Sequence, residues 1–120
     1  MVPGFWTTAL LYEPEKLTGK LPAILNVNGH EAEGKFTEYI QKRCISQARQ
    51  GIVSLNLEWI GMGELAVKEN LHWYNSHLDL AGYNGLGLFY LAMRRGVDFL
   101  WDHPNVDQAR IGVTDRKSVV

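Results

Sequence analysis

The sequence predicts an α/β fold, with a mostly parallel sheet, an antiparallel N-terminal strand and helices flanking the sheet. Short apolar runs bounded by turn residues alternate with segments whose apolar residues recur every three or four positions, as in amphipathic helices. The resulting order is strand, strand, helix, strand, loop, helix, strand, and its strand–helix–strand units favour parallel pairing. The length of 120 residues suits one small domain.

The first predicted strand covers residues 5–12, which are rich in aromatic and β-branched side chains. Glu13-Pro14 ends it, and Thr18-Gly19-Lys20 marks a turn before the second apolar run, residues 23–27. Because the connector is short and polar, we expect these two strands to form an antiparallel hairpin.

The second run stops at Asn28-Gly29-His30, and a helical pattern follows from about Gly34. A short apolar run of this kind is typical of a buried strand in an α/β sheet. Ligands bind at the carboxyl ends of such strands, so the loop from Asn28 to Gly34 is the first place to expect chemistry.

The next predicted element is a helix over residues 35–50, followed by a parallel strand over 51–59. We expect Gly51 to cap the helix and Cys44 to pack in it as a small apolar residue. The apolar stripe consists of Phe36, Ile40, Cys44 and Ala48. The opposite face, expected to be solvated, carries Lys35, Glu38, Lys42, Arg43 and Arg49.

Residues 60–83 form a long irregular segment, and loops of this length in compact domains are usually functional or disordered. Its aromatic content argues against disorder. A second helix is predicted over residues 84–101, ended by His103-Pro104, and a last strand over 110–114. The expected core stripe of that helix comprises Leu86, Phe89, Tyr90, Met93, Val97, Leu100 and Trp101.

Charge and hydropathy argue against several classes of partner. The formal net charge is -1, so the sequence has no electrostatic footprint for nucleic acid or an anionic membrane. No apolar run approaches the roughly 20 residues of a transmembrane helix. We expect no nucleic-acid partner and no transmembrane segment. No signal peptide is visible, and a cytoplasmic or a secreted location stays open.

The motifs predict neither a cofactor nor a metal site. No Walker-type phosphate loop is present, and Gly61-x-Gly63 lacks the third glycine and the helix opening of a dinucleotide site. His72 and His77 share neither one helical face nor one strand face, which disfavours metal binding by this pair. A dinucleotide-dependent oxidoreductase fragment is the least favoured hypothesis, because the turn after residues 23–27 holds a single glycine before Gly34.

Three segments together resemble the α/β-hydrolase fold: Pro-Ala-Ile-Leu-Asn-Val-Asn-Gly-His at residues 22–30, Gly-Ile-Val-Ser-Leu-Asn at 51–56, and residues 98–114. The last of these ends in Arg-Ile-Gly-Val-Thr after an aspartate-containing turn. Within that fold, the chain resembles bacterial esterases of the acetyl xylan esterase and dienelactone hydrolase kind. The resemblance covers about residues 5–114 and implies the N-terminal part of a serine hydrolase that cleaves small-molecule or carbohydrate esters.

The resemblance implies that an oxyanion donor lies in the loop after residues 23–27. Matching Asn28-Gly29-His30 to the family's His-Gly-x loop makes the backbone N–H of His30 the candidate donor, with Gly29 beside it. The asparagine replaces the family's usual histidine. Glu31 either orders this loop by a hydrogen bond or is an exposed carboxylate, and the second reading is favoured. Residues expected either to line a substrate pocket or to pack the loop onto the sheet are Trp59, Met62, Trp73 and Tyr74.

In the family, Thr114 would precede Gly-x-Ser-x-Gly, the turn that exposes the nucleophilic serine. This sequence instead reads Asp-Arg-Lys-Ser-Val-Val at residues 115–120 and ends. Ser118 lacks the flanking glycines and is a poor nucleophile candidate. These six residues are the translation of GATCGGAAGAGCGTCGTG, a common sequencing adapter, and we interpret residues 115–120 as an artefact tail on a hydrolase fragment, residues 1–114.

The expected fragment therefore has no catalytic residue and is inactive as given, because the family's acid and histidine follow the serine along the chain. The alternative hypothesis is a complete flavodoxin-like binding or interaction domain without catalysis. Against it, residues 110–114 are expected at an exposed sheet edge, where unpaired backbone groups promote aggregation.

Overall fold

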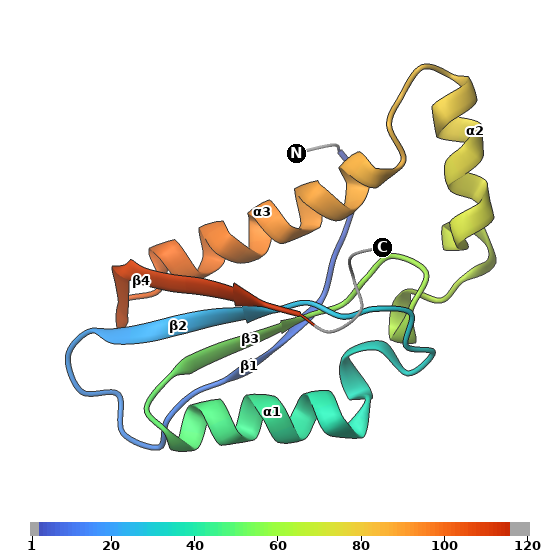
Figure 1. The fold of residues 1–120 in the computed structure, drawn as a ribbon. Coiled ribbons are helices and arrows are strands. Elements are labelled where there is room, and N and C mark those ends of the chain that lie inside the picture. Colours follow the sequence, from blue (N-terminus) through green and yellow to red (C-terminus); the bar gives the residue numbers. More distant parts are fainter. Residues whose placement is uncertain (1–2, 116–120) are drawn as a thin grey trace.

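The computed structural model describes residues 3–115, whose strands form one four-stranded sheet in the order β1-β3-β2-β4 (Figure 1). Strand β2 runs parallel to both neighbours, β3 and β4, and β1 is antiparallel to β3. This confirms the predicted α/β class with a mostly parallel sheet and an antiparallel N-terminal strand. The strands are β1 (Ala9–Tyr12), β2 (Leu21–Asn26), β3 (Val53–Leu57) and β4 (Val106–Thr114).

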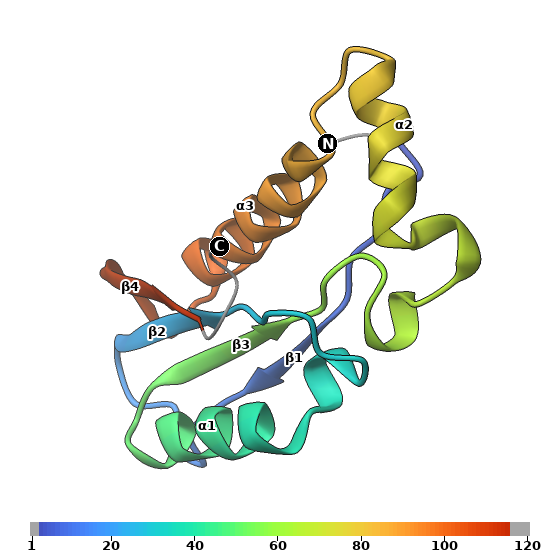
Figure 2. The same cartoon turned by 45° about the vertical axis from the view of Figure 1, so that its right-hand side comes forward.

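Two helices cover opposite faces of the sheet, α1 (Glu38–Arg49) on one and α3 (Leu86–Asp102) on the other (Figures 1 and 2). The connection between β3 and α3 holds the short helix α2 (Asn75–Leu80), which lies beyond the end of the sheet (Figure 2). The remaining helical turns are η1 (Gly34–Phe36), η2 (Gly63–Leu65), η3 (Lys68–Asn70) and η4 (His72–Tyr74). Among residues 3–115, no helix is long and apolar enough to cross a bilayer.

The predicted hairpin between the first two strands is wrong. Strand β1 pairs with β3, with Ala9 opposite Leu57, and β2 is flanked on both sides by parallel partners. All five residues of β3 are buried, so this apolar strand takes a central position and separates β1 from β2. The connector over residues 13–20 therefore crosses the N-terminal end of β3 to reach β2, instead of making a tight turn.

The ends of the helices follow the expected signals with small shifts. Gly51 has a φ of +82°, the left-handed conformation of a residue just past a helix, and α3 ends before His103-Pro104. Helix α1 begins at Glu38, because the preceding residues form the separate turn η1. Strand β4 begins at Val106, earlier than predicted, and it lies at a sheet edge as expected.

The apolar core lies between the sheet and α3. Gly96 allows close packing, because a Cβ there would come within 2.9 Å of the Leu25 side chain. The core residues of the strands and of α3 include Ala23, Leu25, Val27, Val53, Leu55, Leu57, Ala92 and Leu100.

The predicted core stripe of α3 is partly wrong, because Leu86 is 71%, Tyr90 62% and Trp101 50% exposed. These three side chains flank the stripe, whereas the sheet contacts the narrower face around Ala92 and Gly96.

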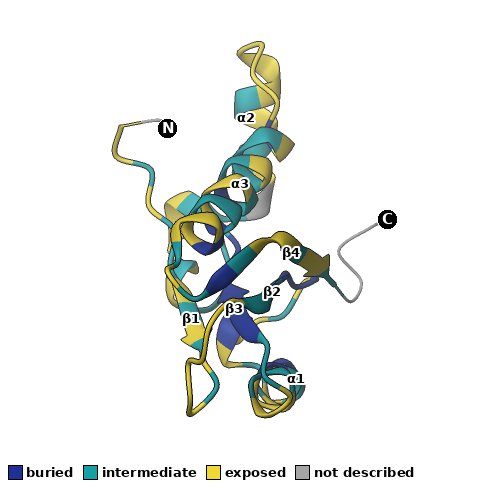
Figure 3. Cartoon of the chain, turned by 90° about the vertical axis from the view of Figure 1, so that its left-hand side faces the viewer, coloured by how far each residue is buried: buried dark blue, intermediate teal, exposed yellow. Residues whose placement is uncertain are grey.

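The opposite face of the sheet carries buried polar side chains, Asn26, Ser54 and Asn56, and α1 covers this face (Figure 3). Asn26 donates to Gln47 of α1 (3.0 Å) and to Ser54 of β3 (2.8 Å), and Arg43 donates to Asn26 (3.0 Å). Because buried polar groups need partners, this network fixes the position of α1 on the sheet.

Candidate functional site

The loop from Asn28 to Gly34 leaves the carboxyl end of β2, where the sequence predicts chemistry. The backbone N–H of Val27 donates to the carbonyl of Thr114 at the end of β4 (3.0 Å). The start of the loop and the end of β4 therefore lie side by side at the edge of the sheet where α/β folds bind ligands.

Asn28 anchors the start of this loop to β3. It is 2% exposed, and its side-chain amide donates to Asn56 Oδ1 and to the Leu57 carbonyl, both at 3.3 Å. Its own carbonyl accepts a hydrogen bond from the Trp59 indole. Asn56 in turn donates to the carbonyl of Lys35 at the far end of the loop (2.8 Å). Residues at the end of β3 thus hold both ends of the loop.

The two candidate oxyanion donors occupy different environments within the loop. Gly29 is buried and its carbonyl accepts from the N–H of Glu31 (3.0 Å), whereas His30 is exposed. Their role as donors stays a prediction. Glu31 accepts a hydrogen bond from the Tyr39 hydroxyl (2.6 Å), so it orders the loop and the favoured reading of an exposed carboxylate is wrong.

The expectation that Lys35 lies on a solvated helix face is also wrong, because this side chain is 3% exposed. Lys35 lies in the turn η1, before α1, so the helical pattern does not apply to it. Its ammonium pairs with the fully buried Glu58 (Nζ to Oε2, 3.2 Å) and donates to Thr8 (3.0 Å). A third contact joins the ammonium to Glu64. The hydrogen bond from Lys35 lowers the pKa of Glu64, which keeps that carboxylate charged.

Sequence reasoning missed Glu58, although one signal was present. Its carboxylate directly follows the buried strand β3 and precedes the buried Trp59. A charged group in such a run must be paired, so a partner cation was to be expected.

The four candidate pocket-wall residues form two separate groups. Trp59 is buried and packs edge-to-face on Phe89 of α3 (5.1 Å between centroids), and Met62 packs against the same core. Trp73 and Tyr74 belong to η4, with ring centroids 6.1 Å apart, and Trp73 is 66% exposed. Whether any of the four lines a substrate pocket stays a prediction.

Two further predictions concern residues that the structure does not fully describe. Ser118 and the other residues of 116–120 lie outside the described residues, and so does the side chain of His72. The tail interpretation and the His72–His77 pair therefore stay predictions. Cys44 is fully buried, and desolvation raises the pKa of its thiol, in keeping with a packing role.

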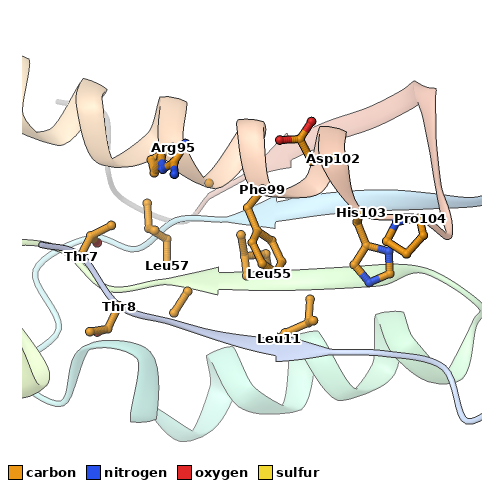
Figure 4. A pocket seen from close by; sticks show the side chains of 12 residues that line it. Thr7, Thr8, Leu11, Leu55, Leu57, Arg95, Phe99, Asp102, His103 and Pro104 are labelled. Atoms are coloured by element: carbon orange, nitrogen blue, oxygen red, sulfur yellow. The ribbon is translucent and has the colours of Figure 1, made fainter. Parts of the chain in front are cut away.

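A groove of about 560 Å³ lies elsewhere, between α3 and the strands β1 and β3 (Figure 4). Leu55 and Leu57 form its floor, and Phe99 points into it from α3. None of its lining residues belongs to the Asn28–Gly34 loop. The groove and the candidate site are thus distinct features. The polar lining residues at its rim include Arg95, Asp102 and His103.

Comparison with known proteins identifies the fold. No protein-family model matches the chain, and neither does any curated protein sequence. A solved structure of a "putative acetyl xylan esterase" from Bacteroides fragilis is 18% identical, with a TM-score of 0.76 over 95% of this chain and 36% of that one. A second, described as m3DLH, is 24% identical, with a TM-score of 0.60 over 91% of this chain and 43% of that one.

The chain therefore spans less than half the length of either solved relative. At these identities the likeness shows the fold, an esterase-like partial α/β arrangement, and the function has to be argued from the site.

Proposed function

We propose that residues 1–114 belong to the N-terminal part of a serine-dependent carboxylic ester hydrolase. The observation that carries the proposal is the hydrogen bond between Val27 and Thr114, which sets the Asn28–Gly34 loop beside the end of β4. In serine hydrolases of this fold, a loop N–H and the residue after the nucleophile together bind the oxyanion. A serine presented just after β4 would face a donor on this loop.

The proposed reaction is acyl transfer through a serine ester. The serine hydroxyl attacks the ester carbonyl while a histidine takes its proton, and the alcohol leaves after protonation by that histidine. The N–H groups near Gly29 and His30 would stabilise the negative oxygen, an effect of about 3–4 kcal/mol for one donor. The serine, the acid and the histidine would all follow Thr114, so the chain as given is proposed to be inactive.

The alternative, a flavodoxin-like binding domain, fits the strand arrangement less well. Flavodoxin-like sheets have the strand order 2-1-3-4-5, with the strands parallel. Here the parallel strands β2, β3 and β4 follow the start of that order, as β3-β2-β4, and the departure is β1, which adds an antiparallel strand beside β3. This additional antiparallel strand is what supports the hydrolase proposal.

The deciding experiment is to sequence the source DNA across the codons for residues 114–120 with independent long reads. We expect the true locus to continue after Thr114 as Gly-x-Ser-x-Gly. The longer protein should then hydrolyse p-nitrophenyl acetate, and replacing its elbow serine by alanine should lower kcat by at least about 10³-fold. The 120-residue chain is the matched inactive control.

Genomic reads that confirm residues 115–120 followed by a stop codon would overturn the hydrolase proposal. The binding-domain hypothesis would then take its place. A longer protein that carries the elbow but keeps full activity without its serine would reject the acyl-enzyme mechanism.

A further inference from the structure

The Glu58 carboxylate occupies a space that two glycines leave open. A Cβ added to Gly34 would lie 1.8 Å from Glu58 Oε1, and one added to Gly63 would lie 2.3 Å from Oε2. Both glycines have positive φ, +56° and +50°, a conformation that other residues rarely adopt. At both Gly34 and Gly63, the absence of a side chain therefore leaves the space that the Glu58 carboxylate fills.

The same carboxylate links two loops that are distant in sequence. Glu58 Oε1 accepts the backbone N–H of Lys35 (2.9 Å) at the end of the Asn28–Gly34 loop, and Oε2 pairs with the Lys35 ammonium (3.2 Å). On its other side lies Gly63, whose N–H donates to the carbonyl of Ala32 within the same loop (3.2 Å). We call Gly34, Lys35, Glu58 and Gly63 the carboxylate clasp.

We propose that Glu58 is a positioning residue that, through the carboxylate clasp, holds the Asn28–Gly34 loop and its backbone N–H groups in place beside the end of β4. The catalytic meaning of this inference rests on the proposed hydrolase function. Oxyanion stabilisation needs donors that are fixed before reaction, because reorienting them would consume the stabilisation they provide.

Burial makes the clasp rigid. Glu58 is 0% and Lys35 3% exposed, so a loop movement that separates them leaves the buried Glu58 carboxylate without its partner cation. An uncompensated buried charge is strongly destabilising, and open loop conformations are correspondingly rare. An ordinary surface loop has no comparable penalty, because its polar groups can be hydrated in every conformation.

Hydrogen exchange on the 120-residue chain, followed by mass spectrometry, tests the clasp without requiring catalysis. The key variant is Gly63→Ala, whose new methyl group would displace the Glu58 carboxylate. The matched control is Gly82→Ala, which also places an alanine at a positive φ (+85°) but has nothing within 4 Å of the added Cβ. Peptides spanning residues 28–36 should exchange about tenfold faster in Gly63→Ala and unchanged in the control.

Two further variants keep the test decisive if Gly63→Ala does not fold. Glu58→Gln keeps the shape of the side chain but removes its charge, and should loosen the same peptides at least as much. Glu64→Gln removes the exposed carboxylate on Lys35 and leaves Glu58 in place, so it should raise exchange in the loop by less, about threefold. In all variants, β2 and β3 should keep wild-type exchange.

Loop exchange within twofold of wild type in the folded variants would overturn the proposal, and so would an equal rise across the loop and the strands. The second result would mean that the clasp contributes to global stability without positioning the loop. Because the readout needs no substrate, the clasp and the esterase proposal can fail separately.

Discussion

Strands β3 and β4 flank the same central strand, β2, and both run parallel to it, yet their surroundings differ. Every residue of β3 is buried, whereas β4 is mostly exposed after Val106 and its Val113 is 53% exposed. β3 has β1 on its outer edge and helices over both faces. Among the described residues, no strand pairs with the outer edge of β4.

The contrast reflects both position and composition, because β3 has a strand on each edge, whereas β4 lies at the edge of the sheet and carries Asp107, Gln108 and Arg110. It also divides the candidate site into two halves. The β3 half holds the loop through Asn56, Glu58 and Trp59, and the β4 half is where the proposed nucleophile would follow. The β3 half is held by these hydrogen bonds, whereas the β4 half lies at the edge of the sheet in the described residues.

The largest expected effect comes from removing the same two methyl groups from each strand. Val53→Ala in β3, at a fully buried position, should lower the free energy of unfolding by about 2 kcal/mol through lost burial and a residual cavity. Val113→Ala in β4 should lower it by less than about 0.5 kcal/mol, as surface substitutions do. Urea unfolding followed by circular dichroism measures both. Equal losses would mean that β4 is covered in solution.

The edge of β4 provides the second test, through association. Its unpaired backbone groups and the exposed Val113 should cause the chain to self-associate at increasing concentration. Val113→Lys should shift the sedimentation profile towards monomer, because a lysine on an edge strand opposes pairing. The control is Lys42→Val, which adds an apolar side chain to the exposed face of α1, away from β4. It shows how much surface hydrophobicity alone changes association. A wild-type chain that is monomeric with a sharp thermal transition would contradict this expectation.

The elements of the fold could largely be predicted, because periodicity and turn residues are local signals. Short apolar runs bounded by turn residues indicated the strands, apolar spacing of three to four residues indicated the two long helices, and Gly51 and Pro104 indicated where helices end. The pairing of β1 with β3 could not be read from these signals, because it is decided by competition among strands for the centre of the sheet. The exposed flank of α3 was missed for a different reason, because an apolar stripe on a helix does not show how much of its width the sheet will cover.

The sequence predicted where the Asn28–Gly34 loop lies in the fold, but it did not predict the side-chain contacts that hold the loop. The stop of the apolar run at Asn28 located the loop at the carboxyl end of β2. The Lys35–Glu58 pair depends on a turn, η1, that falls inside a helical pattern, so Lys35 was placed on the wrong face. The polar network around Asn26 was likewise invisible, because it joins residues from β2, β3 and α1 that are far apart in sequence.

The smallest expected effect concerns the α1 side of β3, where Cys44 lies buried against Ser54. Burial raises the pKa of the Cys44 thiol, and burial also raises that of Tyr12 in β1. A raised pKa means that the folded state favours the protonated form, so this stability is complete below the unfolded pKa and is lost as pH rises through the folded one. The free energy of unfolding should therefore fall as the pH rises above about 8.

Cys44→Ala should make this fall shallower and leave the part that Tyr12 contributes. Urea titrations at a series of pH values measure the slope, and Cys44→Ser, which keeps a small polar group, controls for lost packing. An unchanged slope in both variants would mean that the thiol is hydrated in solution and that α1 covers β3 less closely than the structure has it. The exposed residues of β4 are already hydrated. That result would therefore mean that β3 and β4 differ less in burial than the structure shows, and that β3 is a weaker support for the Asn28–Gly34 loop.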